Sequence, residues 1–131
     1  MVKKIMLVDD DPSVAYTVKH GLESFSEDYK ITCVDSGYEC LEFLGKKQIP
    51  DAILLDIMMP GMSGWETLGE IKKHSSWNSI PVIFLSGRTD DVAKDAGGFL
   101  ADGYIEKPVE IPDLKRRIDQ IIKTKSKCKA T

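Results

Sequence analysis

Residues 51–61 have the sequence Asp-Ala-Ile-Leu-Leu-Asp-Ile-Met-Met-Pro-Gly, which predicts a buried strand with an abrupt end. The run of Ile and Leu favours a strand, and a strand cannot continue through Pro60 and Gly61. Asp56 is therefore expected at the carboxyl end of this strand, at the mouth of a sheet.

A second apolar run, residues 4–8, ends in three consecutive acids, Asp9, Asp10 and Asp11. Two neighbouring strand ends that carry carboxylates predict a Mg²⁺ site, because Mg²⁺ prefers oxygen ligands. Asp56 would then be a nucleophilic carboxylate beside the ion. One acid of the three is expected to cap a helix, since Asp11 precedes Pro12 in the order that favours a helix start.

The composition is typical of one globular domain, with 131 residues, of which 42% are hydrophobic and 30% are charged. The net charge of −3 argues against general nucleic-acid binding. No apolar run approaches the roughly 20 residues of a membrane span. The three cysteines, Cys33, Cys40 and Cys128, lack metal-ligand spacing and predict reduced, mostly buried thiols in a cytoplasmic protein.

Strand-like and helix-like segments alternate five times along the chain, which predicts an α/β fold with a doubly wound parallel sheet flanked by five helices. The first helix should bury one face formed by Val14, Val18, Leu22 and Phe25. A weaker fourth helix is expected over residues 90–96. The five predicted strands are residues 4–8, 31–34, 51–56, 81–86 and 103–106.

Functional sites of such sheets lie at the carboxyl ends of the strands. Ser86 ends the fourth predicted strand and Lys107 follows the fifth, so they should approach Asp56. A lysine can pair with a phosphoryl oxygen and a serine hydroxyl can donate to another, which is the charge neutralisation and positioning that phosphoryl transfer needs.

With these residues in place, the chain resembles the receiver domain of bacterial two-component response regulators. Any one of the matching motifs is weak, but all four in this order are specific. They are Val8-Asp9-Asp10-Asp11-Pro12, Leu55-Asp56 through Gly64, Leu85-Ser86-Gly87 and Asp102 through Pro108. The resemblance implies a flavodoxin-like, five-stranded sheet of order 2-1-3-4-5.

The resemblance also implies roles for single residues. Asp56 would be the phosphoacceptor, with Lys107 and Ser86 as its catalytic partners. Mg²⁺ would bind Asp10, Asp56 and the backbone carbonyl of Met58, with Asp9 in the second shell or acting through water.

Two further expectations follow from the resemblance. Ser86 and the aromatic Tyr104 would form the conformational switch that responds to the phosphoryl group. Lys107-Pro108 would be joined by a cis peptide, a state that X-Pro bonds permit.

Two alternatives remain open at this point. A haloacid-dehalogenase-type phosphatase would explain the string Asp9-Asp10-Asp11-Pro12-Ser13, but it needs an acid pair after Lys107 that the sequence lacks. A degenerate, binding-only receiver would not need the complete set of acids, serine and lysine.

Residues 1–124 are predicted to form the receiver domain, and residues 125–131 a basic tail or the start of a linker. The expected partners are a histidine kinase or histidine phosphotransfer protein and, downstream, a protein target or a fused output domain. Direct nucleic-acid binding and membrane association are not expected. We expect a cytoplasmic monomer, with dimerisation on phosphorylation as an option.

Overall fold

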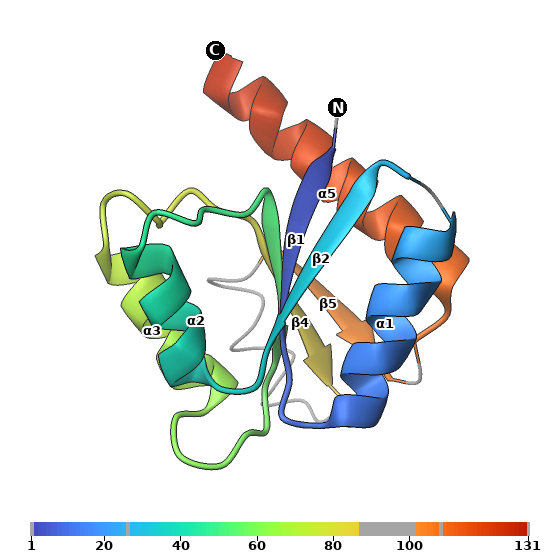
Figure 1. Cartoon of the computed structure of the whole chain (residues 1–131). Coiled ribbons are helices and arrows are strands. Elements are labelled where there is room, and N and C mark those ends of the chain that lie inside the picture. Colours follow the sequence, from blue (N-terminus) through green and yellow to red (C-terminus); the bar gives the residue numbers. More distant parts are fainter. Residues whose placement is uncertain (1, 26, 87–101, 108, 131) are drawn as a thin grey trace.

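The computed structural model describes residues 2–25, 27–86, 102–107 and 109–130, except for the side chains of Ser86 and residues 125–130. Five parallel strands form one sheet in the order β2-β1-β3-β4-β5, which confirms the predicted fold class and strand order. The helices lie on both faces of the sheet (Figure 1). The predicted helix at residues 90–96 lies outside the described residues.

Strands and helices alternate from β1 to β4 as the sequence predicts, and the predicted helix between β4 and β5 lies outside the described residues. In chain order they are β1 (Lys3–Val8), α1 (Pro12–Phe25), β2 (Tyr29–Val34), α2 (Gly37–Gly45), β3 (Ala52–Asp56), α3 (Gly64–Lys73), β4 (Val82–Ser86), β5 (Gly103–Glu106) and α5 (Ile111–Ala130).

The central strands are apolar throughout because both faces of the sheet are covered. Alternate side chains of β3 enter two separate cores. Ile53 and Leu55 pack with α2 and α3, whereas Ala52 and Leu54 pack with α1 and α5. Figure 1 shows the sheet edge-on between these two helical layers.

Two burial predictions are wrong. Phe25 is 53% exposed because it is the last residue of α1, where its ring lies 5.9 Å from the Lys115 ammonium and outside the core. Cys33 is exposed because it lies on β2, the edge strand of the sheet, whereas Cys40 is buried under α2. Both cysteines are free thiols.

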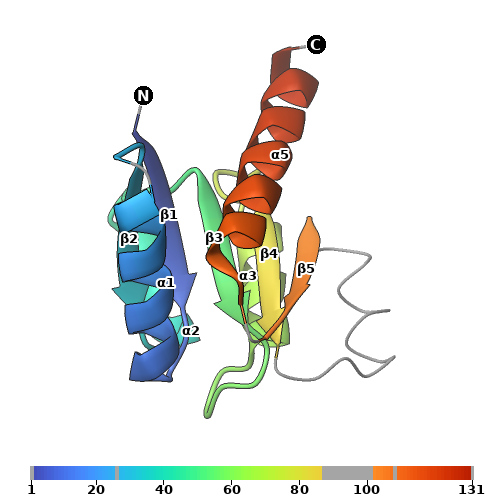
Figure 2. The ribbon, with the colours of Figure 1, turned by 90° about the vertical axis from the view of Figure 1, so that its right-hand side faces the viewer.

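Both ends of the chain lie at the amino-terminal edge of the sheet (Figures 1 and 2). There α5 is held to β1 and β2 by Asp119, which accepts hydrogen bonds from Lys3 (2.7 Å), Lys115 (2.9 Å) and the Tyr29 hydroxyl. Burial opposes ionisation of Asp119, but these hydrogen bonds outweigh it and hold its pKa below the usual value. None of the described helices is long and apolar enough to cross a membrane.

Candidate functional site

The carboxylates predicted to bind Mg²⁺ meet at the carboxyl end of the sheet. Strand β1 pairs directly with β3, with Val8 opposite Leu55, so Asp9 and Asp56 end up side by side. Asp9 and Asp56 are 3% and 6% exposed, whereas Asp10 faces solvent. One oxygen from each of Asp9, Asp10 and Asp56 lies within 4.8 Å of the others, a spacing that one cation can bridge.

Lys107 reaches this cluster from the residue after β5. Its ammonium is 2.9 Å from a carboxylate oxygen of Asp9 and 3.5 Å from one of Asp56. The Lys107 side chain is 21% exposed, so solvent reaches it on one side. One lysine faces two buried carboxylates, and Asp10 adds a third. With all three carboxylates ionised, the described site has a net negative charge, which favours binding of a cation.

The electrostatics of Asp56 reflect that imbalance. Burial and the neighbouring charge of Asp9 raise the pKa of Asp56 to about 6, although the charge and hydrogen bond of Lys107 and a backbone hydrogen bond from Met58 oppose the rise. Burial alone would lower the pKa of Lys107, but its contacts with Asp9 and Asp56 outweigh this effect and raise it. Near neutral pH the site therefore holds an ionised but poorly neutralised carboxylate beside a firmly protonated lysine.

The three consecutive acids, Asp9, Asp10 and Asp11, make different contacts. Asp11 accepts a hydrogen bond from the Ser13 amide at 2.9 Å, which confirms that it caps the start of α1. Asp9 accepts from the Asp11 amide at 2.9 Å through one oxygen and contacts Lys107 through the other. Asp10 is left exposed at the rim, where a cation can reach it.

The loop after β3 places Asp56 directly against the start of α3. Ser63 caps this helix and forms a reciprocal capping box with Glu66. A Cβ atom on Gly64 would lie 2.4 Å from the Asp56 carbonyl oxygen, so only glycine fits there. The role of Gly64 was not predicted from the sequence, although a glycine immediately after a helix cap, where helix formers are favoured, is a usable signal.

We expect Gly64→Ala to lower the free energy of unfolding by about 2–3 kcal/mol, because the added methyl meets backbone atoms that have little room to move. Phosphorylation of Asp56 should also slow, since the substitution displaces its backbone. Gly69, in the same helix, has open space around it, so Gly69→Ala is the matched control and should stabilise by about 0.5–1 kcal/mol. Urea denaturation of both variants measures the difference, and equal effects would contradict the close contact.

The other predicted site residues lie as follows. Ser86 ends β4 beside β3, but its side chain lies outside the described part. Tyr104 lies in β5, half-buried, and packs against the core beneath α2 and α3. Met58 is 73% exposed next to Asp56. Pro108 lies outside the described residues, and with it the predicted cis peptide.

Comparison with known proteins settles the family. Residues 5–119 match the family model described as the response regulator receiver domain. The chain belongs to this family. Membership removes the haloacid-dehalogenase-type phosphatase, because the match to the receiver family covers most of the chain, and it leaves the binding-only receiver as the alternative to be tested.

Individual relatives agree with this assignment. The receiver domain is 39% identical over 122 residues to a probable cyclic di-GMP phosphodiesterase of Vibrio cholerae, covering 92% of this chain but only 27% of that relative. A putative response regulator from Chloroflexus aurantiacus is 29% identical with a TM-score of 0.85, over 93% of this chain and 98% of the other. A CheY-like receiver domain protein from Methanospirillum hungatei is 27% identical with a TM-score of 0.85, over 97% and 98%.

Receiver domains are the phosphoacceptor switches of two-component signal transduction, and this is the function of the chain at the level of the family. They work with histidine kinases and with output domains. The acidic cluster of this receiver domain, Asp9, Asp10 and Asp56, is of the kind that binds Mg²⁺.

Proposed function

We propose that Asp56 accepts the phosphoryl group, from a histidine kinase or a histidine phosphotransfer protein, in a Mg²⁺-dependent reaction that this domain itself catalyses. The observation that carries the proposal is the convergence of three carboxylates and Lys107 on one strand edge, with Asp56 buried and incompletely neutralised. No other described cluster of carboxylates in the chain has this arrangement.

In the proposed step, a carboxylate oxygen of Asp56 attacks phosphorus while the bond from phosphorus to the donor imidazole nitrogen breaks. The bonding electrons leave with the imidazole, and an acyl phosphate forms on Asp56. Lys107 supports the step because its ammonium already lies 3.5 Å from Asp56 and can pair with a phosphoryl oxygen. Ser86 would donate its hydroxyl to another oxygen.

Mg²⁺ would be held by Asp10, Asp56 and the Met58 backbone carbonyl, with Asp9 in the second shell or acting through water. When bound, the ion supplies positive charge that offsets the charge of the incoming phosphoryl group. The described residues fit such an ion, because oxygens of Asp9, Asp10 and Asp56 converge and the charge of the cluster is only partly balanced by Lys107.

Phosphorylation would then bias a two-state equilibrium. A phosphoryl oxygen competes with Asp9 and Asp56 for Lys107, and the Ser86 hydroxyl turns toward the phosphoryl group. Tyr104 would follow into the space that Ser86 vacates. Its half-buried position against the core supports this role, because a small rearrangement there changes the surface of β5.

We infer a cytoplasmic monomer, with dimerisation on phosphorylation as an option, that acts on a protein target or a fused output domain. The Vibrio cholerae relative, which is much longer than this chain, supports the second option. The proposed domain spans residues 1–124. Helix α5 continues through Ala130, so the proposed tail of residues 125–131 begins within that helix.

The test is the intact mass of the protein after incubation with acetyl phosphate, with and without Mg²⁺. We expect a gain of one phosphoryl group that requires Mg²⁺ and that Asp10→Asn reduces strongly. A gain that is independent of Mg²⁺ would contradict the proposed role of the ion. No gain from either acetyl phosphate or a histidine-phosphorylated donor would contradict the proposal as a whole and favour a binding-only receiver.

Met58 is expected to slow loss of the phosphoryl group, because its exposed apolar side chain stands beside the path of an attacking water. We expect Met58→Asn to hydrolyse its acyl phosphate about two- to tenfold faster, the range that one hydrogen bond to water allows. The measurement is the decay of phosphorylated mass with time. Met58→Leu, also apolar, is the control and should decay at the wild-type rate, and an unchanged rate in Met58→Asn would refute the role of Met58.

A further inference from the structure

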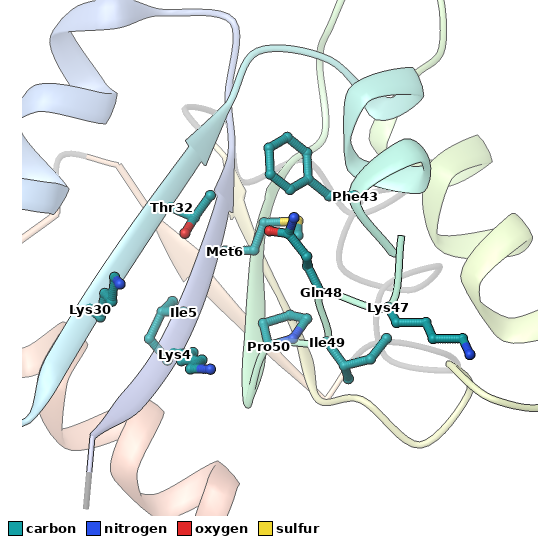
Figure 3. Close-up of a pocket in the computed structure, with 10 residues that line it drawn as sticks. All are labelled: Lys4, Ile5, Met6, Lys30, Thr32, Phe43, Lys47, Gln48, Ile49 and Pro50. Atoms are coloured by element: carbon teal, nitrogen blue, oxygen red, sulfur yellow. The ribbon is translucent and has the colours of Figure 1, made fainter. Parts of the chain in front are cut away.

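A second concave surface lies at the amino-terminal edge of the sheet, at the opposite end from Asp56. It has a volume of about 420 Å³ and lies between the first residues of β1 and β2 on one side and the connection from α2 to β3 on the other (Figure 3). This size falls in the range of ligand-binding clefts. We call it the basal groove, and the residues that matter for its chemistry are Lys4, Lys30, Lys47, Met6, Phe43 and Ile49.

The charge of the basal groove is positive and unbalanced. Lys4, Lys30 and Lys47 come from three different elements, and none of them forms an ion pair with a carboxylate in the described part of the chain. The adjacent Lys46, by contrast, pairs with Glu42 at 3.2 Å. The nearby Asp51 carboxylate accepts a hydrogen bond from the Lys4 backbone amide rather than neutralising a side chain.

Lys47 has a backbone conformation that disfavours lysine. Its φ of 64° is the only left-handed value among the described non-glycine residues. Its amide donates to the Leu44 carbonyl at 3.0 Å, and the Gln48 amide donates to the Phe43 carbonyl at 3.2 Å. This is the Schellman arrangement that ends a helix, whose left-handed position glycine normally occupies. The fold therefore gains nothing from a lysine here, and a strained residue of this kind often marks a functional site.

The groove also has an apolar component. Met6 lines the groove but is only 2% exposed, so its apolar surface comes from the partly buried Phe43 and from Ile49, which is 43% exposed beside Lys47 (Figure 3). Apolar surface next to unpaired cations suits a ligand that carries both negative charge and an apolar side chain, whereas a simple inorganic anion would use only the lysines.

We propose that the basal groove binds an acidic segment of a partner protein, with Asp or Glu side chains paired to Lys4, Lys30 and Lys47 and one aliphatic or aromatic side chain against Phe43 and Ile49. The charge complementarity favours an acidic partner. The open shape of the groove between β2 and the connection after α2 suits an extended segment. This site is spatially separate from Asp56, because it lies at the other end of the strands.

The test uses a synthetic peptide, acetyl-Glu-Glu-Leu-Asp-Glu-amide, titrated into the full ¹⁵N-labelled chain at low ionic strength. We expect amide shifts at Lys30, Thr32, Phe43 and Gln48, and none at Asp56. A peptide with Ser in place of Leu should bind more weakly, and added salt should weaken both peptides.

The variants separate binding from folding. We expect Lys47→Gly to raise the thermal midpoint, because glycine adopts a φ of 64° without strain, and at the same time to weaken peptide binding about two- to fivefold, the range for one exposed ion pair. Lys47→Asn, which tolerates this conformation and removes the charge, should weaken binding equally. Lys46→Asn, which removes the same charge one residue away, should leave the affinity unchanged.

Three results would overturn the proposal. The first is a failure to localise the peptide: either no amide shifts appear in the groove, or Lys46→Asn and Lys47→Asn weaken binding equally, as a diffuse positive surface would. The second concerns pyrophosphate, a probe that carries negative charge but no apolar group. Equal affinity for the Leu peptide, the Ser peptide and pyrophosphate would indicate a simple anion site. The third is concentration-dependent self-association that Lys47→Asn abolishes, which would make a second copy of this chain the occupant.

Discussion

Asp56→Asn is expected to carry no phosphoryl group after treatment with acetyl phosphate and Mg²⁺, under conditions that phosphorylate the wild type fully. The amide is close to the carboxylate in shape but is not a nucleophile toward phosphorus. Asp51, at the other end of the same strand, provides the control, since Asp51→Asn should be phosphorylated like the wild type. A phosphoryl group on the Asp56→Asn protein would place the acceptor elsewhere and refute the site.

The same substitution should stabilise the metal-free protein. The pKa of Asp56 rises from 3.8 to about 6 on folding, so the folded state holds this proton more tightly than the unfolded state. Wild-type stability therefore falls as the pH rises from about 4 to about 6 and is constant above that window as far as Asp56 is concerned. Above pH 6, Asp56→Asn should exceed the wild type by up to about 3 kcal/mol.

Urea denaturation in EDTA between pH 4 and pH 8 measures this difference. The gain should be small near pH 4, where Asp56 is protonated in the folded state and still largely protonated in the unfolded state because the pH is close to the unfolded pKa of 3.8. The gain should also shrink when Mg²⁺ is added, because Mg²⁺ stabilises only the wild type strongly. A gain in stability that did not change with pH would show that burial and the charge of Asp9 do not raise the pKa of Asp56.

Lys107→Ala is expected to lower the free energy of unfolding by about 3 kcal/mol in EDTA, because it leaves Asp9 and Asp56 buried without their cation. Mg²⁺ should bind at least as tightly as in the wild type, since a competing positive charge is gone, and should restore most of the stability. Phosphorylation, where it still occurs, should no longer be coupled to the change at Tyr104, whose amide resonance reports it.

Lys73→Ala is the matched control, because Lys73 forms an exposed ion pair with Glu70 at 3.4 Å. Its loss should cost under about 1 kcal/mol and be indifferent to Mg²⁺. If Mg²⁺ affinity collapsed in Lys107→Ala, Lys107 would be part of the ion's site rather than its electrostatic competitor, and the proposed division of roles would be wrong.

The sequence was sufficient to predict the fold class because its apolar runs are bounded by strong signals. Pro60 and Gly61 end one strand and leave Asp56 at its tip, and Asp11-Pro12 starts the first helix. The strand order came from family resemblance alone, since periodicity does not say which strands are neighbours. That order is what brings Asp9 and Asp56 together.

Other features depend on packing that the sequence does not encode locally. Strand β2 begins at Tyr29, two residues before the prediction, because Tyr29 pairs with Lys3 and its hydroxyl reaches Asp119, 90 residues away in the chain. Phe25 has the right helical spacing for burial, but α1 ends there. The close contact of Lys107 with Asp9, at 2.9 Å, depends on how both side chains are placed in the folded site, and no local sequence pattern reveals this placement.

The position of the two chain ends has a thermodynamic consequence. Both ends lie at the edge of the sheet opposite the aspartates, about 17 Å away for a five-residue strand such as β3. A domain joined at either end is therefore attached away from the phosphoryl group, and an effect on Asp56 from binding at that edge would pass through the sheet and α5. Such coupling is reciprocal. If phosphorylation changes the affinity for a partner at that edge by some factor, binding of the partner changes the equilibrium constant for phosphorylation of Asp56 by the same factor.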